Sequence, residues 1–122
     1  MKSSREKSGR EIVIAAGKGL KHDKGKLMWG LLPWMELKAV VEVLTFGAKK
    51  YKPNNWRKVE NGRQRYFDAA MRHISAIGAG EVSDPETGIN HYAHAICSLL
   101  FSFWHSKKDR KTRANDDGPS YE

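Results

Sequence analysis

Five side chains that commonly bind metal ions or transfer protons lie within fourteen residues, and they are Glu81, Asp84, Glu86, His91 and His94. This stretch runs directly into the most apolar segment of the sequence, residues 93–104. Carboxylates and imidazoles beside a core carry a large desolvation cost unless a partner offsets it, and a divalent metal ion is a common partner. The pattern therefore predicts a metal site at the start of a helix.

The donor types favour Mg or Mn over structural zinc. Structural zinc sites usually recruit several cysteines, whereas this chain has one, Cys97. Two histidines one helical turn apart, His91 and His94, can bind one ion, but they also fit polar residues at a helix start with backbone partners. Cys97 lies inside the apolar segment and is expected to be buried and unreactive.

Catalysis by a nucleophilic side chain is not indicated. The sequence has no Ser-His-Asp order, no nucleophilic cysteine motif, no dinucleotide-binding glycines and no zinc-finger spacing. It does have acidic groups, lysines and the pair Asn54-Asn55. Because metal ions orient water and cations hold leaving phosphates, these residues indicate metal-assisted attack of water on a phosphoryl group.

Helices are expected to position these residues, and the predicted fold class is all-α, a small bundle of three main helices. Apolar residues recur at helical spacing from Pro33 to Lys52, after which Pro53 stops the first helix. A second helix follows a turn-rich connection and ends near Gly78. His73 lies on its apolar side, where a core histidine is the alternative to a catalytic one.

The third helix is expected to be central. It begins at Asp84-Pro85 or at Gly88-Ile-Asn90 and runs to about Lys108. Large apolar groups cover several of its sides, more than two neighbouring helices readily bury. A second copy of the chain is the expected cover, so the protein is predicted to be a homo-oligomer. The alternative is that residues 11–16 fold over the exposed side of a monomer.

The whole chain is expected to form one helical domain with polar ends. Residues 1–16 are predicted to be a basic, extended and partly disordered N-terminal arm, residues 17–108 the domain, and residues 109–122 a disordered tail. The net charge of +8 lies mostly at the ends, which predicts only weak, nonspecific nucleic-acid binding, if any. No apolar run approaches the roughly 20 residues that span a membrane, so a cytoplasmic protein is expected.

Several short motifs follow one another in an order that resembles a known family. They are Lys21-His-Asp-Lys-Gly-Lys26 with Leu31-Leu-Pro33, Val43-Leu-Thr-Phe-Gly-Ala-Lys-Lys-Tyr51 with Asn55-Trp56, Arg65-Tyr66, Arg72-His73, Gly80-Glu81, Asp84-Pro-Glu-Thr-Gly88 and His91-Tyr-Ala-His94. Together they resemble the phage dATP/dGTP diphosphohydrolase family, relatives of the MazG-like all-α nucleotide pyrophosphohydrolases. The resemblance covers roughly residues 18–104.

This resemblance implies a helical fold that assembles into a dimer or tetramer and acts in the host cytoplasm. It also implies cleavage of a purine deoxynucleoside triphosphate, dATP or dGTP, to monophosphate and pyrophosphate with Mg or Mn. Two alternatives stay open. A basic helical phage protein that binds nucleic acid would show salt-dependent DNA binding without hydrolysis, and a protein that only binds a partner would show neither activity.

The resemblance further implies roles for single residues. MazG relatives hold metals with Glu-x-x-Glu on one helix and Glu-x-x-Asp on the next; here Glu81-Val-Ser-Asp84 has the second spacing, and the first motif is missing around Glu42. Glu81 and Asp84 are the expected metal ligands, with Glu42, His91 or His94 completing the set. The expected catalytic residues are Glu81, Asp84 and His73. The expected substrate-binding residues are Asp23, Lys26, Lys50, Asn55 and Arg72.

Overall fold

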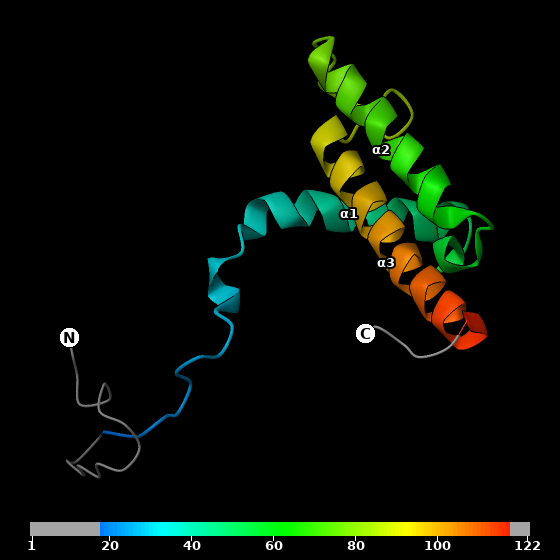
Figure 1. Ribbon diagram of the computed structural model, residues 1–122. Helices are drawn as coiled ribbons and strands as arrows, with labels where there is room; N and C mark the ends of the chain where they lie inside the picture. The colour runs from blue at the N-terminus through cyan, green and yellow to red at the C-terminus, as the bar shows by residue number, and fades with distance from the viewer. Residues whose placement is uncertain (1–17, 118–122) are drawn as a thin grey trace. The chain divides into compact units, whose positions relative to one another are not determined.

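The computed structural model describes residues 18–117, drawn in colour in Figure 1. Contacts between residues divide the chain into two units, residues 1–32 and 33–122. In the described part of the first unit, a turn at Gly25 (φ 83°) lets the backbone N–H of Lys26 donate to the carbonyl of Asp23 at 3.0 Å. A short 3-10 helix, η2 (Trp29–Leu31), follows. The predicted arm, residues 1–16, lies outside the described residues.

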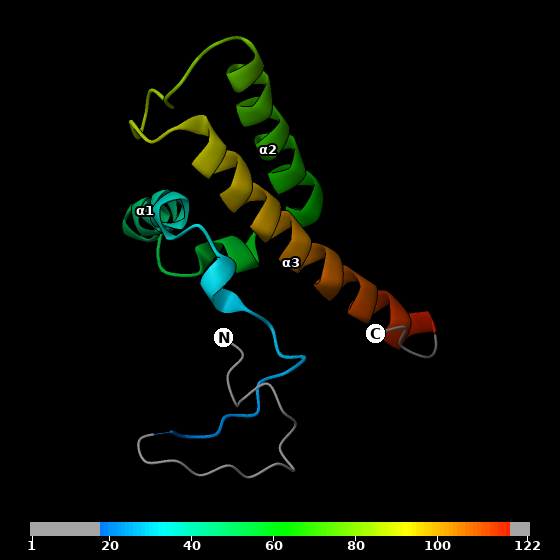
Figure 2. The same ribbon diagram turned by 90° about the vertical axis from the view of Figure 1, so that its left-hand side faces the viewer.

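The second unit is built from three α-helices, which confirms the predicted all-α class. They are α1 (Trp34–Lys50), α2 (Gly62–Gly78) and α3 (His91–Asp117), with the short 3-10 helix η3 (Asn55–Lys58) between α1 and α2. Two views show α2 beside α3 and α1 crossing α3 (Figures 1 and 2). The third helix is therefore central, as its apolar pattern predicts. No described helix is long and apolar enough to span a bilayer.

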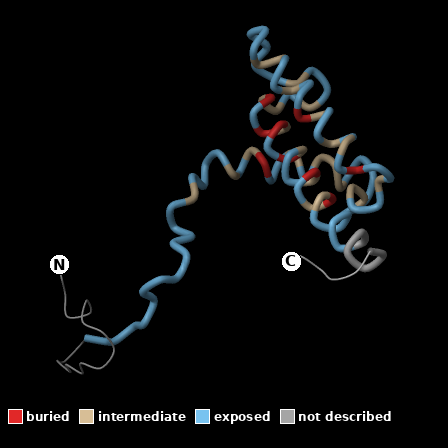
Figure 3. The backbone as a smooth tube through the Cα atoms, viewed as in Figure 1, coloured by how far each residue is buried: buried red, intermediate tan, exposed pale blue. Residues whose placement is uncertain are grey.

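Small side chains let the helices approach one another closely. The buried hydrophobic residues described are Val40 of α1, Ala70 of α2, and Ala93, Ala95 and Cys97 of α3. Figure 3 colours the buried residues red, and three of these five belong to α3. Large apolar side chains lie mostly at the rim or on the outside, so this core is small for a unit of its length.

Cys97 is expected to resist thiol reagents. Burial raises the pKa of its thiol to about 11, so the reactive thiolate is scarce at neutral pH. Alkylation of the native protein by iodoacetamide at about pH 8 should be slower by a factor of 100 or more than alkylation of the urea-unfolded chain, by the roughly two-unit difference in pKa. Rapid modification of the native protein, followed by mass spectrometry, would contradict the buried position.

Aromatic rings hold η3 against α3. Trp56 stacks on Phe101 with ring centroids 4.2 Å apart, and Tyr66 of α2 meets the same Phe101 edge-on at 5.1 Å. The ring nitrogen Nε2 of buried His105 lies 2.8 Å from the carbonyl oxygen of Trp56, to which it donates. The hydroxyl of Ser102 donates to the carbonyl of Arg63 at 2.8 Å, so this small residue sits in a close helix contact. The connection between α1 and α2 is thereby anchored.

The helix limits differ from the predicted ones at three places. α1 ends at Lys50, two residues before Lys52. α3 begins at His91, so the start at Asp84-Pro85 was wrong and the start at Gly88-Ile-Asn90 was right: the side-chain oxygen of Asn90 accepts the N–H of Ala93 at 2.8 Å. α3 also continues to Asp117, past Lys108, because no glycine or proline interrupts residues 105–117.

Candidate metal centre

The segment between α2 and α3 folds back on itself and places its acidic residues beside the two helices. Gly80 (φ 91°) and Gly88 (φ 74°) adopt the left-handed conformation that glycine tolerates best. The N–H of Asp84 donates to the carbonyl of Ile89, just beyond Gly88, at 2.9 Å, and the N–H of His91 donates to the carbonyl of Val82 at 3.0 Å. Residues distant from each other in the loop are thus joined at its base.

Three potential metal ligands come from three different parts of this unit: His73 from α2, Asp84 from the loop and His91 from α3. One ligand atom of each lies within 4.8 Å of the other two. The Nδ1 atoms of His73 and His91 are 2.9 Å apart. Two imidazole nitrogens bound at about 2.1 Å to one ion would be separated by about 3 Å at an angle near 90°. The same spacing is that of a hydrogen bond between the two rings when one of these nitrogens carries a proton, and it fits a shared metal ion when neither does. We call these three residues the metal cluster.

Glu81 orients the ring of His91. Its carboxylate oxygen lies 3.0 Å from Nε2 of His91, which is only 4% exposed. The carboxylate accepts a hydrogen bond from Nε2–H, so Nδ1 of His91 keeps its lone pair and faces His73. A carboxylate that orients a histidine in this way is typical of the second layer around a metal ion. In this structure Glu81 contacts a potential ligand, His91, and its predicted role as a metal ligand stays a prediction.

Asp84 combines a structural and an electrostatic role. Its Oδ1 accepts the backbone N–H groups of Glu86 at 2.8 Å and Thr87 at 3.0 Å. Burial raises the pKa of Asp84, but the hydrogen bonds from Thr87 and Glu86 outweigh it and hold the pKa below its usual value of 3.8. The carboxylate is therefore ionised at neutral pH and carries the negative charge of the cluster.

His94 lies beside the metal cluster rather than within its triad. Its ring stacks on that of His73 with centroids 4.7 Å apart, and its Nε2 lies 2.7 Å from the Thr87 hydroxyl. Burial lowers the pKa of both His73 and His94. Neutral imidazoles are the form that binds metals. His73, for which a core position was the alternative, is half-buried and belongs to the metal cluster.

The metal-free protein is expected to lose stability as the pH falls below 6.5. Burial holds the folded pKa of His73 and His94 below the ordinary value of 6.5, so the unfolded chain binds protons first on acidification. Stability falls wherever the unfolded state binds more protons. Asp84 contributes only near and below pH 3.8. Thermal melts in chelator should give a lower Tm at about pH 5.5 than at about pH 7.5; equal values would contradict the burial.

The other predicted site residues lie at varied distances from this arrangement. Glu42 is exposed on α1 and belongs to no group of potential ligands among the described residues, so its prediction as a ligand finds no support. Lys50, at the end of α1, donates to Glu86 at 2.6 Å. Asp23 and Lys26 belong to the first unit, and their substrate contacts stay predictions.

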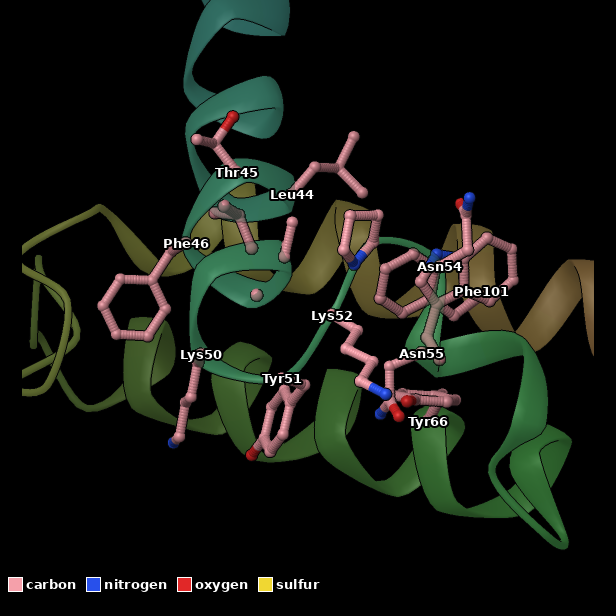
Figure 4. Close-up of a pocket in the computed structure, with 15 residues that line it drawn as sticks. Leu44, Thr45, Phe46, Lys50, Tyr51, Lys52, Asn54, Asn55, Tyr66 and Phe101 are labelled. Atoms are coloured by element: carbon pink, nitrogen blue, oxygen red, sulfur yellow. The ribbon is translucent and has the colours of Figure 1, made fainter.

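Two cavities of the second unit share the side chains of Tyr51, Asn55 and Tyr66. The first, which we call the apolar cavity, measures about 470 Å³ and lies between the C-terminal half of α1 and the segment that leads into η3 (Figure 4). The second, which we call the arginine cavity, measures about 610 Å³ and is lined by Arg65 and Arg72 of α2. The predicted substrate residues Asn55 and Arg72 therefore lie in cavity walls.

Tyr51 and Tyr66 were not predicted as site residues. Both tyrosines belong to motifs that carry the family resemblance: Tyr51 ends the motif that begins at Val43, and Tyr66 follows Arg65 in another motif. Membership of these motifs could have marked them as candidate site residues. Their shared wall exists only because the chain reverses between α1 and α2.

Comparison with known proteins places these features in context. The family described as dATP/dGTP diphosphohydrolase, N-terminal, matches residues 16–116. A protein of Salmonella phage PMBT28 named dATP/dGTP diphosphohydrolase is 36% identical over 86 residues, which make up 70% of this chain and 29% of the phage protein. The chain therefore spans less than a third of the length of that relative. No solved structure matches the present chain.

Proposed function

We propose, because the chain belongs to the dATP/dGTP diphosphohydrolase N-terminal family, that it hydrolyses purine deoxynucleoside triphosphates to monophosphate and pyrophosphate. The observation that carries the proposal is the metal cluster. Its three ligands converge from three segments, and Glu81 holds His91 with a lone pair directed at the same point. Titratable groups gathered in a partly buried place, where His91 is buried and His73 and Asp84 are half-buried, are typical of functional sites.

The donor set favours manganese over magnesium. Mg²⁺ prefers oxygen ligands and keeps several waters, whereas imidazole suits transition ions. His73 and His91 supply two nitrogens and Asp84 supplies one carboxylate. We therefore rank Mn²⁺ ahead of Mg²⁺ as the working ion. A divalent ion held here would polarise a phosphoryl oxygen and lower the pKa of a bound water.

The chain's own cations would hold the phosphates. The Lys50 ammonium donates to Glu86 at 2.6 Å, and that hydrogen bond raises the pKa of Lys50 above its usual value of 10.5, so the side chain is a cation at neutral pH. Arg72 precedes His73 in α2 and lines the arginine cavity. In the proposed reaction, the oxygen of water bonds to the α-phosphorus, the bond from that phosphorus to the bridging oxygen breaks, and pyrophosphate leaves. The free carboxylate oxygen of Glu81 accepts the proton of the water.

We also propose that the protein is a homo-oligomer, a dimer or tetramer. α2 carries a stripe of exposed apolar residues with Phe67 42% and Met71 46% exposed, and α3 carries another with Ile96 43% and Phe103 60% exposed. Exposed apolar stripes on a unit with so small a core favour an interface in which a second copy of the chain buries them. Light scattering at micromolar concentration tests it, and a stable monomer would refute it.

A product assay tests the proposed activity. Purified protein is incubated with dATP or dGTP and either Mn²⁺ or Mg²⁺, and pyrophosphate is separated from phosphate. Equal amounts of deoxynucleoside monophosphate and pyrophosphate are expected, with faster turnover in Mn²⁺. Release of phosphate, or no hydrolysis with either ion, would refute the proposal. Salt-dependent DNA binding without hydrolysis would support the nucleic-acid-binding alternative.

A further inference from the structure

We propose that the apolar cavity binds the base of the nucleotide and that Asn55 contacts the edge of that base. This inference rests on the proposed function and adds a binding subsite to it. It concerns side chains that lie outside the metal cluster and that no comparison assigns. The ligand class is a purine deoxynucleoside, with its phosphates outside the cavity.

The size and lining of the apolar cavity suit a flat, weakly polar ring system. Its volume of about 470 Å³ lies within the usual range of about 300–1,000 Å³ for small-molecule sites. Leu44, Pro53 and Phe101 are among the residues that line it, and Figure 4 labels the side chains of Leu44 and Phe101. Apolar walls with few polar groups favour binding by ring burial and leave specificity to those few groups.

Asn55 is the polar group best placed to read a base. Its side chain is half-buried, lines both cavities and makes no hydrogen bond within the described residues. One amide offers both donors and an acceptor, and the edges of purines present donors and acceptors side by side. A half-buried amide without a partner on the chain therefore matches the edge of a base.

The backbone that carries Asn55 is held firmly. Asn54 adopts a left-handed conformation (φ 64°), and the N–H of Asn55 donates to the carbonyl of Lys52 at 3.1 Å. The next residue, Trp56, is stacked on Phe101 and bonded through its carbonyl to His105. A support this rigid keeps the amide in place before any ligand arrives, which reduces the entropy lost on binding.

A shared wall, one ion pair and neighbouring residues connect the apolar cavity to the metal cluster. The arginine cavity shares a wall with the apolar cavity and carries Arg65 and Arg72. Arg72 directly precedes His73 of the cluster. Lys50 lines the apolar cavity and bonds to Glu86, two residues beyond Asp84. Base, sugar and triphosphate would thus meet apolar, mixed and cationic surroundings in turn.

Filling the cavity tests the inference. Leu44→Trp places a large ring in the apolar cavity, and Val41→Trp is the matched control because Val41 lies on the same helix, is 55% exposed and lines neither cavity. In Leu44→Trp the KM for dATP and dGTP should rise at least about tenfold with little change in kcat. Binding of inorganic tripolyphosphate, which has no base, should stay at the wild-type level. Val41→Trp should behave as wild type.

A second variant covers the case in which Leu44→Trp fails to fold, as judged by circular dichroism. Asn55→Ala removes only the amide and should raise the KM for dATP by roughly tenfold, the range expected when one bidentate base contact is lost. Binding without hydrolysis is followed by an NMR titration of the metal-free protein with deoxyadenosine, which should shift the amides of Gly47 and Asn55.

The outcomes separate this inference from the proposed function. Wild-type KM values in both Leu44→Trp and Asn55→Ala, in a protein that hydrolyses dNTPs, would overturn the base subsite and leave the function standing. Deoxyadenosine binding that Leu44→Trp abolishes, in a protein that hydrolyses nothing, would support the subsite and refute the function. No shift of either amide with deoxyadenosine would also overturn the subsite.

Discussion

Asp84→Asn is expected to weaken Mn²⁺ binding by more than about 100-fold and to lower dNTP hydrolysis to a similar degree, since changes in the layer behind a ligand already cost about 10–100-fold. The substitution removes the charge that the cluster needs. It keeps an oxygen that can accept the N–H groups of Glu86 and Thr87, so the turn and the fold should survive. Calorimetry with Mn²⁺ measures the binding, and circular dichroism checks the fold.

Two further variants sharpen this result. Glu81→Gln should weaken Mn²⁺ binding by only about 10–100-fold, because Glu81 orients His91 and does not itself join the triad. Glu42→Gln should leave Mn²⁺ binding unchanged, since Glu42 is exposed on α1. If Asp84→Asn bound Mn²⁺ as tightly as the wild type, the assignment of the metal cluster as the Mn²⁺ site would be wrong. A loss in Glu81→Gln as large as that in Asp84→Asn would show that Glu81 is a ligand, as the sequence predicts.

Gly62→Ala is expected to destabilise the protein by about 3 kcal/mol, the sum of overpacking and a lost buried hydrogen bond. A methyl group at this first residue of α2 would overlap the imidazole ring of His105. That ring is 3% exposed, donates to the carbonyl of Trp56 and cannot move without breaking this contact. Thermal unfolding should show a drop in Tm of roughly 15 °C for a domain of this size.

Gly78→Ala is the matched control for this stability measurement. Gly78 closes the same helix, and a methyl group there would meet nothing within 4 Å. The change should be neutral or slightly stabilising, because alanine loses less backbone entropy than glycine on folding. If Gly62→Ala melted at the wild-type temperature, the close packing of α2 on His105 would be wrong.

The sequence by itself determined the helices and the part of the candidate site that lies between Glu81 and His94. Helices depend on local patterns, so the apolar spacing after Pro33 and through residues 93–104 was enough to predict α1 and the central position of α3. The acidic and histidine residues from Glu81 to His94 also stood out because they are close in the sequence. Their chemistry indicated a metal ion before any contact was known.

Only the tertiary structure decided which of those residues meet. His73 is eighteen residues from His91, yet their ring nitrogens are 2.9 Å apart because α2 and α3 lie side by side and the glycine-bearing loop reverses the chain. Glu42 has the right residue type but belongs to no group of potential ligands among the described residues. Residue type specifies what a side chain can bind, but the set of ligands depends on contacts between segments, which local patterns do not encode.

Contacts between segments also decided where α3 begins and where the two cavities lie. Both Asp84 and Asn90 are good helix caps by residue type, and the fold uses Asn90 because Asp84 holds its own turn. The shared wall of Tyr51, Asn55 and Tyr66 needs α1, η3 and α2 in place at once. A cavity is the space left between packed elements. The sequence could therefore predict Asn55 and Arg72 as substrate-binding residues, but only the packing shows that both line the arginine cavity.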